Sequence, residues 1–320
     1  MGLSEQTASG EPRRHRVILH CGAPKTGSTS LQNYFADNAD RLKADGVVYP
    51  PRFFRRSLVD PLHESFTRLR AGKRPEDTVM VEARARLDGL FADEGVHTVL
   101  ISNESILGEP YSAAQRGFFP EHGAAIKQLV RLFEGYDVTV VYFIRDFEGF
   151  LPSYYVQYVR MGGYLSFERF CAHVGGDSIS WQPVVKALKK AFGEQNVSCW
   201  EAAAMRQAPV RIVDEAFGRL LPSLPEFDPT HYNRNQSVGK GVLAFYRGMN
   251  RLLDNALTKR RRRKVRPIMR QYLFEPLAYL SRVFSRGGKP EPVDAPPAKQ
   301  VLRWRQQYSE DRKALGFSQK

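Results

Sequence analysis

The segment HCGAPKTGSTSLQ, His20 to Gln32, follows the short apolar run 17–19 and carries two glycines, a lysine and several hydroxyl side chains. Gly22 and Gly27 have the separation found in a phosphate-binding loop of the form G-x-x-x-x-G-K-[ST]. Glycines let the backbone turn sharply, and the N–H groups at the start of a following helix attract an anion. The segment predicts a strand, a phosphate-binding loop and a helix over 28–42. The alternative is a strand–turn–helix whose glycines serve only the turn.

The lysine of this loop is displaced from its usual position. Ser28 stands where the lysine of the pattern belongs, Thr29 occupies the hydroxyl position, and the lysine of the loop is Lys25. A lysine ammonium acts as a point charge, so Lys25 would reach a bound anion from a different angle. The segment therefore keeps the chemistry of an anion cradle with a changed geometry.

Short β-rich segments alternate with amphipathic helical segments along the first two hundred residues. The predicted strands are 16–21, 46–50, 96–103, 137–145 and 196–201, and helices are predicted at 78–92, 121–134, 148–160 and 182–192. This alternation is typical of a three-layer α/β/α fold with a mostly parallel central sheet. Ligands of such sheets bind beyond the carboxyl ends of the strands, which draws attention to 22–30, 103–105 and Arg145.

The 320 residues are enough for one large α/β domain or two modest ones. We predict a disordered segment 1–15 and one domain over 16–284, with a core at 16–201 and a helical part at 202–284 that Pro267 and Pro276 interrupt. The Pro- and Gly-rich stretch 285–298 predicts a linker. A helical extension over 299–320 is expected to dock back on the domain. Its docking side chains would be Val301, Leu302, Trp304, Tyr308 and Leu315.

The net charge of +14 is concentrated in part in TKRRRRKVRPIMR, residues 258–270. Such a run is either a solvated helix face or a contact with an acidic surface, which is a membrane, nucleic acid or polyanionic substrate. We expect peripheral contact with an anionic membrane surface through 259–270, and we do not expect nucleic acid as a partner. The three cysteines form no metal pattern, and no signal peptide or membrane span is apparent, so a cytoplasmic location is expected.

A second candidate anchor lies in YFIRDFEGFLPSYYVQYVR, residues 142–160. Arg145 leaves the strongest predicted strand at the ligand-binding edge, and Ser153 follows near the start of a helix. A forked arginine contact and a hydroxyl donor together suit a phosphate group. The alternative is that Arg145 pairs with Asp146 or Glu148.

APKTGSTSLQ followed by VVYFIRDFEGFLPSYYVQY resembles the sulfotransferase family that uses 3′-phosphoadenosine-5′-phosphosulfate (PAPS). The resemblance is good over the first half of the chain and loose over the second. It implies PAPS as cosubstrate without a metal, and a 3′-phosphate site at Arg145 and Ser153. Arg234, in NRNQSVGKG, is the candidate for the family's C-terminal phosphate-binding element, with Lys240 behind it. The residues implied to hold the 5′-phosphosulfate are Pro24, Lys25, Thr26, Gly27, Ser28, Thr29 and Ser30.

The resemblance also implies catalytic roles. Lys25 would stabilise charge on the leaving phosphate. Glu104 follows the predicted strand 96–103, where small-molecule members of the family carry a histidine base, and it is our candidate base. It could instead cap a helix or pair with a lysine. His20 is expected to be structural, with His63 and His122 as further candidates for the base.

One departure concerns the acceptor. Small-molecule members carry a tryptophan for the adenine just after the loop hydroxyls, where this chain has Ser30, so the adenine contact is unassigned. We expect a sulfotransferase that acts on a hydroxyl or amine of an acceptor, with a carbohydrate, glycolipid or other lipid-linked glycan favoured over small phenols. The rival functions are a small-molecule kinase that uses ATP and a non-catalytic nucleotide-binding module recruited to an anionic surface.

Overall fold

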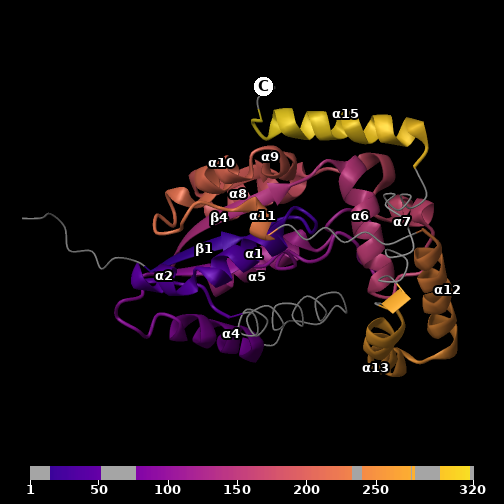
Figure 1. Ribbon diagram of the computed structural model, residues 1–320, viewed down its shortest axis with the longest axis horizontal. Helices are drawn as coiled ribbons and strands as arrows, with labels where there is room; N and C mark the ends of the chain where they lie inside the picture. The colour runs from indigo at the N-terminus through magenta and orange to yellow at the C-terminus, as the bar shows by residue number, and fades with distance from the viewer. Residues whose placement is uncertain (1–14, 52–76, 233–239, 275, 278–295, 318–320) are drawn as a thin grey trace, which may run out of the picture.

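The computed structural model describes residues 15–51, 77–232, 240–274, 276–277 and 296–317 (Figure 1). Within them, five parallel strands form one sheet in the order β2-β3-β1-β4-β5. The parallel sheet with helices between its strands confirms the predicted fold class. The strands are β1 Arg16–His20, β2 Val47–Val48, β3 Thr98–Ser102, β4 Asp137–Ile144 and β5 Val197–Glu201.

Alternate residues of the strands enter two separate hydrophobic layers, one on each face of the sheet. Ile18 and Leu100 belong to one layer, while Leu19 and Ile101 belong to the other. Because both faces are buried, the strands read as continuous apolar runs rather than as alternating ones. The first layer includes residues of α1 Ser28–Asp37, α2 Ala39–Ala44 and α10 Pro209–Val213, and the second includes residues of α4 Asp77–Gly89, α5 His122–Leu132 and α8 Gln182–Phe192.

The helix that follows the first strand is shorter than predicted. The expectation of one helix over 28–42 is wrong, because the chain leaves helical geometry at Asn38 between α1 and α2. Asn38 satisfies the end of α1 itself, since its Nδ2 donates to the Tyr34 carbonyl at 2.9 Å. The second strand also shrinks from the predicted 46–50 to two residues.

Helix α6, Phe147–Arg160, lies at the carboxyl edge of the sheet, and α12, Lys240–Ala256, runs beside it (Figure 1). Asn250 of α12 ties the two together, because its Nδ2 donates to the carbonyls of Val159 at 2.7 Å and Gly163 at 2.9 Å. The remaining elements are α7 Phe167–His173, η1 Gly176–Ser178, η2 Glu194–Asn196, α9 Ala202–Gln207, η3 Asp214–Gly218 and α11 Pro229–Tyr232.

The basic run forms helix α13, Lys259–Met269, and a π-helical turn η4, Arg270–Phe274, follows directly. The predicted interruption at Pro267 is wrong, since this proline lies inside α13. The break before α13 comes earlier, at Thr258, whose side chain accepts a hydrogen bond from the Arg261 N–H. Pro267 has no backbone N–H, so one hydrogen bond of the helix is missing at this position. A missing hydrogen bond of this kind can accompany a change in helix geometry, such as the π-helical turn η4.

The last described helix, α15 Ala298–Ala314, packs against the domain near the carboxyl ends of β4 and β5 (Figure 1). Trp304 is buried in the main core, and Asp311 is fully buried beside the start of α8. The prediction that Leu302 docks α15 on the domain is wrong, because 63% of the surface of Leu302 is exposed. The predicted linker 285–298 lies outside the described residues except for its last three positions. None of the described helices combines the length and apolar character that crossing a lipid bilayer requires.

Candidate active site

The loop after β1 runs alongside β4 beyond the end of its own strand. The N–H groups of Cys21 and Ala23 donate to the carbonyls of Val141 at 3.1 Å and Phe143 at 2.9 Å. A Cβ atom on Gly22 would lie 3.0 Å from the Cβ of Phe143, which is an unusually tight contact. The first glycine of the motif therefore lets the loop pack closely against β4. Pro24 is buried in the same stretch.

The turn itself is left-handed at two residues. Lys25 has a φ of 69° and Gly27 a φ of 98°, which places α1 immediately after the turn. Within the described residues, no side chain caps α1. The N–H groups of Ser30 and Leu31 donate to the Gly27 carbonyl at 3.0 and 3.3 Å. The N–H groups that precede them at the start of α1 lie where a helix attracts an anion. Thr29 is exposed and Ser30 half-buried at this end.

Two hydroxyl groups expected to bind phosphate are used within the protein. Thr26 is buried, and its Oγ1 donates to the Ala23 carbonyl at 2.7 Å. The Ser28 hydroxyl donates to Oε2 of Glu104, which follows β3. The phosphate contacts of these two residues would therefore come from their backbone N–H groups. Glu104 does not cap a helix, because the residues around it form turns.

Lys25 and Glu104 come together at this edge of the sheet. Lys25 keeps an exposed side, yet its pKa is lowered, mainly by partial burial. The Glu104 carboxylate opposes this shift, and the charges of Arg160 and Arg145 add to it. The loop that carries Glu104 is held by its neighbours. Asn103 Oδ1 accepts from the Ser105 N–H at 2.8 Å. The site thus brings the Lys25 ammonium, the Glu104 carboxylate and the Arg145 guanidinium to one loop.

Arg145 connects the two sequence motifs. It follows β4, and its NH1 donates to the Lys25 carbonyl at 2.8 Å. Its Nε lies 3.8 Å from Asp146 Oδ2, and burial lowers the pKa of the guanidinium while Asp146 opposes that change. The Nε is buried and makes no hydrogen bond within the described part of the chain. A Cβ on Gly149 would lie 2.8 Å from Arg145 NH2, so this glycine leaves room for the guanidinium.

The structure resolves the alternative pairing of Arg145 in part. Arg145 does form the longer contact with Asp146, but Glu148 pairs with Arg305 of α15 at 2.7 and 2.9 Å. Arg145 therefore pairs with Asp146, one of the two alternatives, while Glu148 is taken up by α15. Ser153, its predicted partner, is half-buried on α6.

Arg160 was not among the sequence candidates, although its charge acts on Lys25. It is the last residue of α6, and its charge lowers the pKa of Lys25. A signal for it existed, since it lies seven residues after Ser153 and seven residues correspond to two helical turns.

The remaining sequence candidates lie elsewhere. His20 is fully buried, its Nδ1 is 2.7 Å from Ser102 Oγ, and burial lowers its pKa to about 3. It is therefore structural, as predicted. His122 contacts the Phe119 carbonyl at 2.6 Å. His63 and Arg234 lie outside the described residues, and the side chain of Lys240 does too.

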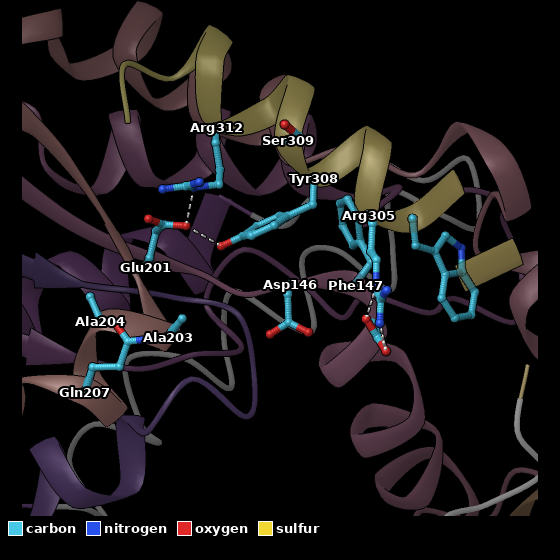
Figure 2. A pocket seen from close by; sticks show the side chains of 12 residues that line it. Asp146, Phe147, Glu201, Ala203, Ala204, Gln207, Arg305, Tyr308, Ser309 and Arg312 are labelled. Atoms are coloured by element: carbon cyan, nitrogen blue, oxygen red, sulfur yellow. Dashed lines mark hydrogen bonds and ion pairs between the residues drawn. The ribbon is translucent and has the colours of Figure 1, made fainter. Parts of the chain in front are cut away.

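A cavity of about 460 Å³ lies beside Arg145, under α15 (Figure 2). Asp146 faces it from the sheet side, and Glu201 lies between Tyr308 and Arg312, at 2.8 Å from each (Figure 2). Because these charged groups are already paired across the cavity, we assign them to the docking of α15 rather than to the binding of a ligand. Within the described residues, no group of three or more His, Cys, Asp or Glu side chains is placed to hold a metal ion.

Comparisons with known proteins add little to this geometry. No protein-family model matches the chain, and no curated protein sequence matches it. Among solved structures, the sulfotransferase from Alicyclobacillus acidocaldarius is similar over 69% of this chain and 88% of that chain, with 17% sequence identity and a TM-score of 0.37. A similarity this weak carries no argument about activity, so any function must be argued from the site itself.

Proposed function

We propose that this protein is a PAPS-dependent sulfotransferase that transfers a sulfuryl group to a hydroxyl or amine of an acceptor, with a carbohydrate or glycolipid as the expected acceptor. One observation carries the proposal. The hydrogen bond of 2.8 Å between Arg145 NH1 and the Lys25 carbonyl joins the two motifs that resemble the 5′-phosphosulfate and 3′-phosphate sites of that family. A ligand that bears anions at both ends of an adenosine fits such a pair of sites.

The residues present suit these two anions. The N–H groups at the start of α1 and the Lys25 ammonium would hold the 5′-phosphosulfate. The buried Nε of Arg145, which makes no hydrogen bond within the described residues, and the Ser153 hydroxyl would hold the 3′-phosphate. Asp146 lies 3.8 Å from that Nε. Its negative charge would repel the 3′-phosphate, so it limits the affinity of the 3′-phosphate site.

The proposed chemistry is an in-line displacement. Glu104 takes the proton from the acceptor hydroxyl as the acceptor oxygen bonds to sulfur. The bond between sulfur and the bridging phosphate oxygen breaks, and adenosine 3′,5′-bisphosphate leaves. Lys25 stabilises the negative charge that develops on the leaving phosphate. Ser28 orients the Glu104 carboxylate through its hydroxyl. Positioning and electrostatics therefore supply most of the rate.

The test is the binding of adenosine 3′,5′-bisphosphate, measured by calorimetry against adenosine 5′-phosphate, which lacks the 3′-phosphate. Arg145→Ala should weaken binding of the bisphosphate by about 1.5–3 kcal/mol, which is the contribution of a hydrogen bond to a charged group. It should barely change binding of the monophosphate. Gly149→Ala keeps the charge but pushes on the guanidinium, so it should shift the same ligand in the same direction.

Three outcomes would contradict the proposal. An equal loss of affinity for both nucleotides in Arg145→Ala would contradict the assignment of the 3′-phosphate site to Arg145. Thermal stabilisation by ATP–Mg²⁺ but not by the bisphosphate would favour the small-molecule kinase. Nucleotide binding without release of adenosine 3′,5′-bisphosphate from PAPS, in the presence of fractionated acceptors, would favour the non-catalytic module.

A further inference from the structure

The helix α13 and the turn η4 that follows it have an inner face, which packs on the domain. Met269 and Leu273 contact the main core from this face. Arg266 NH2 donates from the same segment to the Gly162 carbonyl at 3.1 Å. Residues at spacings of three and four lie on one side of a helix, so the positions between the inner ones form a separate outer face.

The outer face carries two cations followed by two large apolar side chains. Its members are all exposed and follow one another at spacings of three, four and four: Arg261, Lys264, Ile268 and Tyr272. The exposed fraction is 59% for Ile268 and 72% for Tyr272. Tyr272 belongs to η4, where four residues still come close to one full turn. Scattered exposed apolar residues are common, but these two are neighbours and adjoin the cations.

The charge of this segment is of one sign. Residues 258–274 contain eight Lys or Arg and no Asp or Glu. Like charges at helical spacings repel one another, so the segment folds against its own charge. The first turn of α13 is basic as well and holds no acidic residue, which opposes the helix dipole at that end. A negatively charged surface would offset both effects.

The apolar pair distinguishes among the possible anionic surfaces. The backbone of a nucleic acid is bound by cations and hydrogen-bond donors, and an exposed isoleucine would gain nothing from it. A bilayer instead presents phosphate headgroups directly beside acyl chains. A helix that lies in this interface carries Lys or Arg next to large apolar side chains. Tyrosine is enriched at the same boundary, because its ring is apolar and its hydroxyl is polar.

We propose that the outer face of α13 and η4 binds the surface of an anionic lipid bilayer. Ile268 and Tyr272 enter the boundary between headgroups and acyl chains, while Arg261 and Lys264 pair with lipid phosphates. The inner face stays packed on the domain, so the binding is peripheral. It needs both parts of the face, since two apolar side chains alone are a weak anchor. The inference uses no residue of the candidate active site and does not depend on the proposed sulfotransferase function.

The experiment is sedimentation of the full chain with lipid vesicles. One set of vesicles is pure phosphatidylcholine, and the other holds equal parts of phosphatidylcholine and phosphatidylglycerol. The wild-type protein should bind the anionic vesicles at least about tenfold more tightly than the neutral ones. This binding should weaken as sodium chloride is added, because salt screens exposed charges.

Two double variants separate the two parts of the face. The joint Ile268→Ser and Tyr272→Ser variant keeps every charge, yet it should bind the anionic vesicles about tenfold or more weakly, because apolar surface no longer leaves water. The joint Arg261→Gln and Lys264→Gln variant keeps the apolar pair and should also lose about tenfold or more. All four positions are exposed, so the Tm of each variant should stay close to that of the wild type, which checks folding.

Matched controls lie on α15, which stands on the other side of the molecule from α13 (Figure 1). Leu302→Ser removes an apolar side chain that is about as exposed as Ile268. The joint Lys299→Gln and Arg303→Gln variant removes two cations from exposed positions. Both controls should bind the anionic vesicles within about twofold of the wild type, since their distance from the membrane leaves their charges screened.

The proposal is overturned if the wild type binds neither kind of vesicle, or binds both equally well. It is also overturned if either α13 variant matches the wild type, or if a control loses as much as its α13 counterpart. Binding of a DNA duplex by a wild-type protein that ignores both vesicles would assign the basic face to a nucleic acid instead.

Discussion

At the residue scale, Glu104 combines two tasks in one carboxylate. It accepts the Ser28 hydroxyl hydrogen and its charge favours the protonated form of Lys25. Neither of these tasks needs a group that takes up a proton, whereas the proposed role as catalytic base does. An amide of the same shape keeps the acceptor for Ser28 but removes the negative charge and the capacity to take up a proton.

Glu104→Gln is expected to leave the affinity for adenosine 3′,5′-bisphosphate unchanged and to remove most of the turnover. Glutamine keeps the shape and an acceptor oxygen for Ser28 but cannot accept a proton at neutral pH. Steady-state rates and calorimetry on the same preparation give both quantities. Ser28→Ala is the matched control, because it removes the orienting hydroxyl and should lower turnover less. A near-normal rate for Glu104→Gln would place the base elsewhere.

His20 makes a different prediction, about stability. Burial lowers its pKa from 6.5 to about 3, so the folded state takes up this proton only in strong acid, whereas the unfolded state takes it up below about pH 6.5. Stability from this group is therefore complete above pH 6.5 and is lost as the pH falls toward 3. Between pH 7 and pH 5 the loss should be about 2 kcal/mol.

Chemical denaturation at pH 7 and pH 5 measures this loss. His20→Gln should be less stable than the wild type at pH 7, because Gln cannot fill the same space among Phe35, Phe143 and Phe217. The informative quantity is the change between the two pH values, which should be about 2 kcal/mol smaller in the variant. An identical change in both proteins would contradict the assignment.

Among the site residues, those at strand ends could be predicted, whereas for Arg160 the sequence offered only its helical spacing after Ser153. Lys25, Glu104 and Arg145 each follow a strand, and parallel strands bring their carboxyl ends to one edge. The charge of Arg160 acts on Lys25, and the end of α6 that carries it is bonded to α12 through Asn250. The hydrogen bond from the Ser28 hydroxyl to Glu104 could not be predicted from the sequence either, because it depends on the position of Glu104 in the folded protein.

At the scale of elements, the strands were predictable because burial on both faces leaves continuous apolar runs. The fully buried β3 illustrates this, and its predicted span exceeds the observed one only at the ends. Boundaries that depend on a single local contact were not predictable. The end of α1 is bonded to the Asn38 side chain, and α13 continues through Pro267.

The docking of α15 depends most on Asp311. Its carboxylate accepts from the Ser180 hydroxyl at 2.7 Å, the Trp181 N–H at 2.8 Å and the Gln182 side chain at 3.0 Å. Asp311→Ala should lower the free energy of unfolding by about 2–4 kcal/mol, because buried donors lose their acceptor. Its neighbour Glu310 is exposed, so Glu310→Ala should stay within about 0.5 kcal/mol of the wild type.

Urea denaturation measures both variants. Limited proteolysis gives a second readout, because loss of the Asp311 contacts should make cleavage within α15 faster while leaving the strands protected. Equal stability of the two variants would mean that Trp304 and the Arg305–Glu148 pair hold the helix without Asp311.

At the scale of the whole molecule, the distribution of positive charge predicts how the reaction responds to metal ions. A kinase with this type of loop uses Mg²⁺ to neutralise its phosphates. Here Lys25 lies within the loop and Arg145 beside it, so the protein itself supplies the neutralising charge. Excess EDTA should leave the initial rate of sulfuryl transfer essentially unchanged. Loss of activity in EDTA that Mg²⁺ restores would contradict the sulfotransferase proposal and favour the small-molecule kinase.

Because Trp304 and Tyr308 lie near the end of the chain, the surface that they cover stays exposed for a time during synthesis. The sheet is complete at Glu201, and Phe147, which Tyr308 contacts in the finished protein, has been made before that. About a hundred more residues must be added before Trp304 emerges, which takes about 5–20 s at ordinary translation rates. For that interval the aromatic surface under α15 has no cover. A nascent chain paused there offers chaperones a binding site that the finished protein does not have.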